Sequence, residues 1–153
     1  MKEGGWEAVL AYYKNLGEEY YEALIEMLIF DVLILNTDRH FGNFGLLVDN
    51  KKNSIVKPAP IFDNGLSLFA DALDDDLENI EQYAKTKSMK NAGDFMIFAK
   101  SIMTKKAKQK VRKLIGFKFK KTSKYNLPAK RLRKIEKFVE ARAARLLELE
   151  NNV

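Results

Sequence analysis

The spacing of apolar residues predicts two consecutive helices at the start of the chain. Residues 6–16 carry an apolar stripe with helical periodicity, and Gly17 separates them from residues 18–35, which are apolar on most sides from Leu24 onward. The stripe of the first segment comprises Trp6, Val9, Leu10 and Tyr13. A helix with as little polar surface as the second segment belongs in the centre of a domain, so we expect it to be buried.

A β-hairpin is predicted after these helices. Residues 44–48 and 54–56 are rich in strand-forming residues and flank residues 49–53, DNKKN, whose Asp and Asn side chains favour a turn. Two prolines then end the second strand, and residues 61–62 predict a short third strand.

Helical periodicity returns in the second half of the chain. Residues 66–92 are polar, partly acidic and irregular, whereas residues 93–103 and 105–115 carry apolar residues at helical spacing. A last helix is predicted to start at Tyr125-Asn126-Leu127-Pro128 and to run to about Leu149, because proline favours the first turn of a helix.

The composition is that of one globular domain. The 153 residues are 46% apolar, and no internal repeat or low-complexity linker divides them, so we expect residues 1–153 to form a single, mainly α domain with a small β-hairpin (α+β). The absence of cysteine excludes disulfides and thiolate metal sites. No signal peptide is apparent, and the most apolar stretch, Ala23–Leu35, is too short and too charged to span a membrane. A soluble cytoplasmic protein without a membrane partner is therefore expected.

Charge is distributed unevenly along the sequence. From Lys100 to Arg145 there are eighteen Lys and Arg residues against two acids, while the segment from Asp71 to Glu81 holds a cluster of six acids. Such a basic half can bind phosphate-rich partners, including nucleic acid. Solvated helix faces, or pairing with the acidic cluster, explain the same cations. We favour this second explanation because the cations alternate with an apolar stripe.

Two loop sequences carry the candidate chemistry. Residues 36–45, NTDRHFGNFG, contain Asp38 and Asn43 with four residues between them, and residues 61–65, IFDNG, contain Asp63. In kinases, an aspartate and an asparagine at this spacing supply a base for the attacking hydroxyl and a ligand for Mg²⁺, and a further aspartate completes the metal site. The hairpin between the loops returns the chain to its start, so we expect the three side chains to converge on one open cleft.

Each of these residues also has an ordinary structural explanation. Asp and Asn are common in turns, and His40, the single histidine, is by itself more often structural than catalytic. Their conjunction, with an apolar helix before the first loop and a hairpin between the two, favours the kinase hypothesis.

The run DRHxxN, residues 38–43, resembles the catalytic loop of atypical kinases, most closely that of the HipA-like bacterial Ser/Thr kinases, and the basic tail KYNLPAKRLRKIEKFVEARA also resembles that family. The resemblance implies a protein-kinase-like C-lobe that uses ATP and Mg²⁺ to phosphorylate a protein substrate. It implies Asp38 as the catalytic base and His40 as a contact to the transferring phosphoryl group. It also implies that Asn43 and Asp63 bind the metal of the nucleotide complex.

The parts of a kinase that hold the nucleotide are not found in the sequence, which has no GxGxxG, no P-loop and no Val-Ala-Ile-Lys strand. In HipA-like kinases those parts precede this lobe. The resemblance therefore implies a carboxy-terminal lobe that works with an N-lobe-bearing polypeptide, or with an antitoxin-like partner as in toxin–antitoxin pairs, and that has little activity alone. Aromatic residues of the first helices are expected to face that partner: Trp6, Tyr12, Tyr13, Tyr20 and Tyr21.

Two other functions stay open from the sequence. The chain can be a non-catalytic kinase remnant that acts as a regulator or decoy for a related full-length kinase, or a basic helical module that binds nucleic acid. Binding of Mg²⁺–ATP separates the catalytic lobe from both. A steep salt dependence of DNA or RNA binding would support the second.

Overall fold

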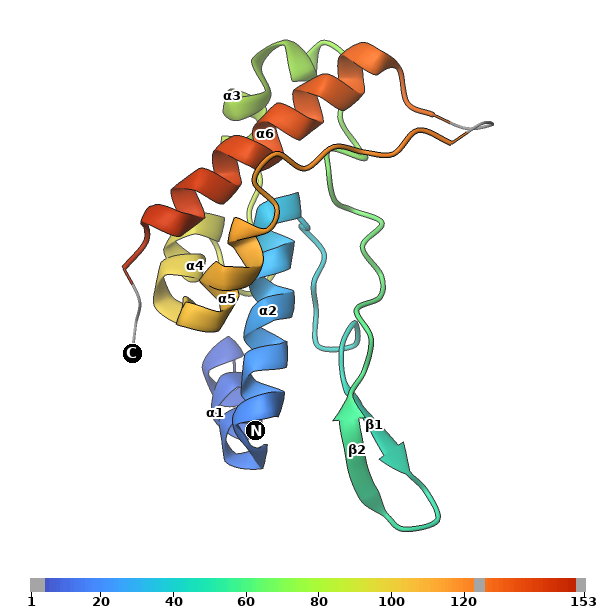
Figure 1. Cartoon of the computed structure of the whole chain (residues 1–153), viewed down its shortest axis with the longest axis vertical. Helices are drawn as coiled ribbons and strands as arrows, with labels where there is room; N and C mark the ends of the chain where they lie inside the picture. The colour runs from blue at the N-terminus through green and yellow to red at the C-terminus, as the bar shows by residue number, and fades with distance from the viewer. Residues whose placement is uncertain (1–4, 123–125, 151–153) are drawn as a thin grey trace.

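The two helices predicted at the start of the chain are present in the computed structural model, which describes residues 5–122 and 126–150. Helix α1 covers Trp6–Leu16 and α2 covers Glu18–Ile34, with Gly17 between them at a φ of 138°, a conformation that favours glycine. As predicted, α2 is buried along most of its length, and it lies between the other helices and the hairpin (Figure 1). No helix that the structure describes, α2 included, has the length and apolar character needed to cross a membrane.

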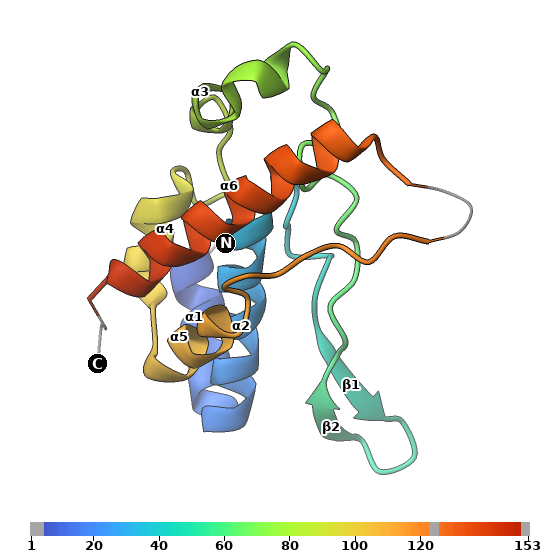
Figure 2. The ribbon, with the colours of Figure 1, turned by 45° about the horizontal axis from the view of Figure 1, so that its top comes forward.

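Three further helices contact α2. They are α4 (Phe95–Ile102), α5 (Lys105–Arg112) and α6 (Ala129–Glu148). Helix α6 crosses α2 near the C-terminal end of α2 (Figures 1 and 2). The first two lie within the predicted segments but are shorter at one or both ends. The side chains of Asp94 and Thr104 accept hydrogen bonds from first-turn N–H groups and so fix where α4 and α5 begin.

The last helix begins later than the sequence predicts. It starts at Ala129, directly after Pro128, so Asn126 and Leu127 precede the helix rather than form its first turn. Tyr125, the other residue of the predicted start, lies outside the described residues. The buried face of α6 comprises Ile135, Phe138, Val139, Arg142, Ala143 and Leu146.

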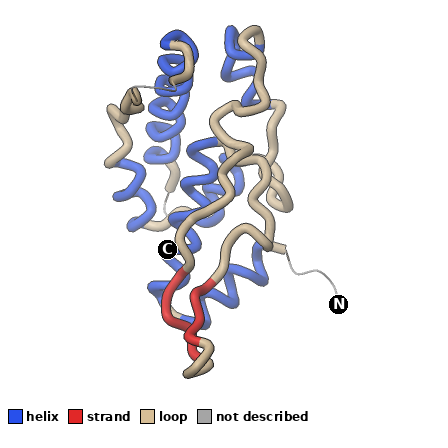
Figure 3. Tube along the Cα trace, turned by 90° about the vertical axis from the view of Figure 1, so that its right-hand side faces the viewer, coloured by secondary structure: helices blue, strands red, loops and turns tan. Residues whose placement is uncertain are grey.

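The predicted hairpin is confirmed, and it extends away from the helices. Strand β1 (Leu46–Asp49) pairs antiparallel with β2 (Ser54–Pro58), with an irregular register between Leu47 and Val48. Asp49 closes the turn, because its Oδ1 accepts from the N–H groups of the two lysines of the turn. Figure 3 shows the sheet at one end of the molecule, with the segments that enter and leave it side by side.

The prediction of a third strand at residues 61–62 is wrong. Residues 59–64 have no regular structure, because Pro60 lacks an N–H group and the Phe62 carbonyl accepts a hydrogen bond from the side chain of Arg39 rather than from a strand. A side chain thus takes the place of the strand partner that the sequence pattern suggested.

The prediction that residues 66–92 are irregular throughout is also wrong. A 3₁₀ helix, Asp76–Asn79, is followed directly by the short helix α3, Ile80–Lys85. Asn79 begins α3 by accepting a hydrogen bond at 3.3 Å from the N–H of Gln82. We predicted no helix in this segment because it is polar and partly acidic.

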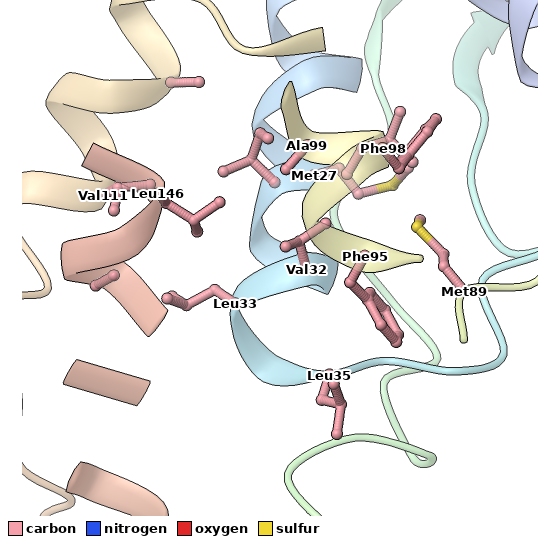
Figure 4. Close-up of a cluster of buried hydrophobic side chains, with 14 of the residues drawn as sticks. Met27, Val32, Leu33, Leu35, Met89, Phe95, Phe98, Ala99, Val111 and Leu146 are labelled. Atoms are coloured by element: carbon pink, nitrogen blue, oxygen red, sulfur yellow. The ribbon is translucent and has the colours of Figure 1, made fainter. Parts of the chain in front are cut away.

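The hydrophobic core gathers around α2. Side chains from α2, α4, α5 and α6 meet there with Met89, which comes from the loop before α4 (Figure 4). Leu35 ends α2 in the left-handed conformation, with a φ of 56°, and its side chain is part of this core. The candidate catalytic residues lie in the loop that follows Leu35, and the buried side chain of Leu35 fixes the start of that loop.

The acidic cluster pairs with cations of α6. The ion pairs are Lys130–Glu78, Lys134–Glu78, Arg131–Asp74 and Arg145–Glu81. The pairing that we favoured from the sequence is therefore found for part of the basic half. Exposed pairs of this kind contribute little stability, but they occupy charges that would otherwise be free to attract phosphate.

Candidate functional site

Arg39 joins the two candidate loops to each other and to the core. Its fully buried guanidinium donates from Nε and Nη2 to both carboxylate oxygens of Asp31 in α2, at 2.7 and 2.9 Å. Its Nη1 donates to the carbonyls of Asn43 and Phe62, each at 2.7 Å. Because one nitrogen bridges these two carbonyls, the loop that holds Asn43 and the loop that holds Asp63 lie next to each other.

Asp31 is surrounded by donors. Besides the two bonds from Arg39, its Oδ1 accepts from Nδ2 of Asn36 at 2.8 Å. Burial raises the pKa of Asp31, and the hydrogen bonds and charge of Arg39, together with the bond from Asn36, oppose that rise. The pKa of Asp31 remains raised overall, but both of its oxygens accept from the guanidinium of Arg39, so this buried pair anchors both loops on α2.

Further hydrogen bonds fix the chain directly after Asp63. Nη2 of Arg39 donates to Oδ1 of Asn64 at 2.6 Å, and the N–H of Thr37 donates to the carbonyl of Leu66 at 3.1 Å. Asp63 itself has a φ of 55°, in the left-handed region. Aspartate enters this region more readily than most non-glycine residues, so the conformation costs little here.

Asp38 forms an ion pair with Lys90, which lies far away in the sequence. Nζ of Lys90 is 2.8 Å from Oδ1 of Asp38, and both side chains are partly exposed. The hydrogen bond from Lys90 lowers the pKa of Asp38 below its usual range, and the positive charges of Lys90 and His40 act in the same direction. At neutral pH Asp38 is therefore a carboxylate, the form that a group accepting a hydroxyl proton requires.

Asn43 and Asp63 carry the types of oxygen donor that magnesium prefers in proteins. Asn43 is 5% exposed, and its Nδ2 donates to the carbonyl of Asp38 at 3.3 Å, so Oδ1 is the atom that would bind a metal. The carboxylate of Asp63 is exposed. Within residues 5–122 and 126–150, no group of three or more His, Cys, Asp or Glu could hold a metal ion. One carboxylate and one amide oxygen suit Mg²⁺ that is completed by phosphate oxygens and water, rather than an ion enclosed by protein ligands.

His40 has a defined tautomer when neutral. Its Nδ1 accepts from the N–H of Gly42 at 3.1 Å, so the proton of the neutral ring lies on Nε2. A Cβ at position 42 would lie only 3.1 Å from the ring, so glycine there permits this close approach. Nε2–H remains as the group that can donate to a phosphate oxygen.

Trp6 of α1 supports the first loop. Its ring centre lies 5.2 Å from that of Phe41 and 5.5 Å from that of Phe44, and its Nε1 donates to the carbonyl of Lys90 at 3.2 Å. One buried aromatic side chain thus contacts both the loop that carries Asp38 and the segment that supplies its ion-pair partner.

The prediction that five aromatic residues expose a partner surface is wrong for Trp6 and Tyr13. Both are buried, at 4% and 6% of their accessible area, because they complete the core beneath the first loop. Tyr20 and Tyr21 are half-buried against that core, and Tyr12 is exposed. These residues therefore do not form one exposed aromatic surface.

Sequence reasoning missed the roles of Arg39 and Lys90. The role of Arg39 could have been inferred from Asp31, because a carboxylate inside an apolar helix needs a buried partner. Arg39 follows Asp31 by eight residues. Lys90 had no comparable signal, since its pairing with Asp38 spans 52 positions and depends on the fold. The convergence of Asp38, Asn43 and Asp63 on one cleft stays a prediction.

The sequence matches no family model and no curated protein, and the structure matches no solved structure. The functional assignment therefore depends on the residues themselves and on their arrangement.

Proposed function

We propose that this chain is the catalytic and Mg²⁺-binding lobe of a HipA-like Ser/Thr kinase, with a protein-kinase-like C-lobe fold. The observation that carries the proposal is the set of bonds from one buried guanidinium, that of Arg39, to Asp31, Asn43 and Phe62. These bonds bring the Asp-x₄-Asn loop against the loop of Asp63, which is the arrangement that phosphoryl transfer with a metal-bound nucleotide requires.

In this proposal each polar residue has a separate role. The ionised Asp38 accepts or orients the hydroxyl of a Ser or Thr in a protein substrate. Oδ1 of Asn43 and the carboxylate of Asp63 hold Mg²⁺, which when bound neutralises the phosphates of ATP. Nε2–H of His40 donates to the phosphoryl group. Arg39 touches no substrate and serves to hold the two loops together.

The proposal includes a partner that grips the nucleotide. In the proposal, Asn43 and Asp63 bind the metal ion of the nucleotide complex. Adenine and the inner phosphates of ATP need a further binding surface, which the partner would supply. Positioning accounts for most of phosphoryl-transfer catalysis, with effective molarities on the order of 10⁵ M or more. The chain by itself is therefore expected to bind ATP weakly and to transfer phosphate negligibly until an N-lobe-bearing polypeptide is added.

Nuclear magnetic resonance (NMR) titration of the chain with ATP, with and without Mg²⁺, tests the proposal. We expect Mg²⁺-dependent shifts of backbone amides in residues 36–45 and 61–65, lost in Asp63→Asn. A matched control is Asp75→Asn, which removes a carboxylate from the acidic cluster and should change nothing. Shifts confined to α5 and α6, where cations are dense, would instead show non-specific phosphate binding and contradict the proposal.

The nucleic-acid alternative is weakened by the pairing of α6 cations with the acidic cluster. Its own test is the dependence of DNA and RNA affinity on salt, which is steep when many cations contact phosphates. The remnant alternative predicts that Mg²⁺–ATP produces no shifts at either loop.

A further inference from the structure

Lys90 is presented to Asp38 by a turn that backbone hydrogen bonds and a core residue hold in place. Met89, next to it, is buried in the core, and the N–H of Met89 donates to the carbonyl of Gly93 at 2.8 Å, while the N–H of Gly93 donates back at 3.0 Å. Gly93 has a φ of 79°, which favours glycine. With the bond from Trp6 to the carbonyl of Lys90, the backbone of this residue is held on both sides.

The stability of the fold does not explain this arrangement. The Lys90 and Asp38 side chains are 47% and 38% exposed, and exposed ion pairs contribute little net stability. A turn anchored by a core residue and a buried tryptophan therefore directs an ammonium group at the candidate base, although the resulting ion pair adds little to the stability of the fold.

We propose that Lys90 is a catalytic residue whose ammonium group contacts the transferring phosphoryl group beside Asp38. This inference rests on the proposed kinase function. A hydroxyl that donates to Asp38 lies within hydrogen-bond reach of that carboxylate, and the phosphorus it attacks lies next to the hydroxyl oxygen. In this proposal the ammonium, 2.8 Å from the same carboxylate, donates to the phosphoryl oxygens that lie beside the bound hydroxyl. Its three N–H groups allow it to keep Asp38 and to donate to phosphate at once.

The step is balanced without any change in the protonation of Lys90. The hydroxyl oxygen of the substrate forms a bond to the γ-phosphorus of ATP, and the bond from that phosphorus to the β,γ-bridging oxygen breaks. The hydroxyl proton passes to Asp38, and ADP leaves with the electron pair. Lys90 acts only through its charge and hydrogen bonds on the oxygens of the transferring group, where His40 supplies a weaker donor.

Affinities for Mg²⁺–ATP and Mg²⁺–ADP, measured on the same full chain by NMR titration, test this inference. In Lys90→Gln we expect the affinity for ATP to fall roughly tenfold, the loss typical of one charge-assisted hydrogen bond, with the affinity for ADP unchanged. Lys90→Arg should retain most of the ATP affinity. The control is Lys87→Gln, which removes another ion-paired lysine of the same segment, 2.6 Å from Asp71, and should leave both affinities unchanged.

The possible results separate this inference from the proposed function. An equal loss for ATP and ADP, no loss, or tighter ATP binding in Lys90→Gln would overturn the role of Lys90 and leave the kinase proposal standing. Wild-type chain that binds neither nucleotide at millimolar concentration would overturn both. A fall in ATP affinity alone, with the unfolding midpoint unchanged, is the expected result.

Discussion

The two candidate loops and the hairpin that joins them are built in opposite ways. The loops are fixed by a buried guanidinium, Arg39, that bonds to a core helix and to both loops. The hairpin exposes apolar side chains, with Leu47, Val48 and Val56 at 40%, 56% and 55% of their accessible area. Isolated two-stranded hairpins are marginally stable in water. The site is therefore held together from the core and not through the hairpin, although the hairpin is its covalent connection.

The largest expected effect comes from removing the counterion of Arg39. Asp31→Asn leaves a buried guanidinium without a charged partner, and we expect a loss of about 3–5 kcal/mol in the free energy of unfolding. Urea denaturation followed by circular dichroism measures it. Asp75→Asn, an exposed carboxylate in the acidic cluster, is the control. A loss close to that of the control would mean that the ion pair does not anchor the loops.

Deleting most of the hairpin tests whether it helps to hold the two loops together. Replacing residues 48–56 with Asn-Gly joins the paired residues Leu47 and Lys57 by a two-residue turn that suits a hairpin. We expect stability to change by about 1 kcal/mol or less, because a shorter connection costs little and few buried contacts are lost. Amide resonances of residues 36–43 should stay in place. Their collapse would show that the hairpin, and not Arg39, holds the loops together.

Asp38→Asn should separate function from stability. The side chain is partly exposed and forms an ion pair with the partly exposed Lys90, so we expect the urea midpoint to stay unchanged. Phosphate transfer, assayed with radiolabelled ATP in the presence of an N-lobe-bearing partner, should be abolished. Full transfer by the variant would exclude Asp38 as the base, and a large drop in the midpoint would assign it a structural role.

The smallest expected effect concerns the exposed pairs of the acidic cluster. Lys130 and Lys134 lower the pKa of Glu78 from 4.5 to about 2. Because the folded-state pKa lies below the unfolded value, the contribution of Glu78 is present above pH 4.5 and is lost as the pH falls towards about 2. Glu78→Gln should therefore flatten the loss of stability over that acid range. If Glu78→Gln and the wild type lose free energy of unfolding equally over this pH range, measured by urea denaturation, these ion pairs do not form in solution.

Sequence patterns predicted the parts of this molecule that depend on local periodicity. The buried helix α2 and the hairpin follow from apolar spacing and turn residues, and both are present. The supposed third strand failed because the Phe62 carbonyl is used by a side chain from another loop. The Asp38–Lys90 pair could not be predicted, since no short-range pattern links residues that only the tertiary fold brings together.

The most direct test of the central claim is whether Asn43 and Asp63 bind one metal ion. Paramagnetic Mn²⁺, added with ATP at substoichiometric amounts, broadens NMR signals close to the ion. We expect selective broadening of the backbone amides of both residues, lost in Asp63→Asn and retained in Asp75→Asn. Broadening confined to the acidic cluster, or of one loop without the other, would show that Asn43 and Asp63 do not share a metal ion.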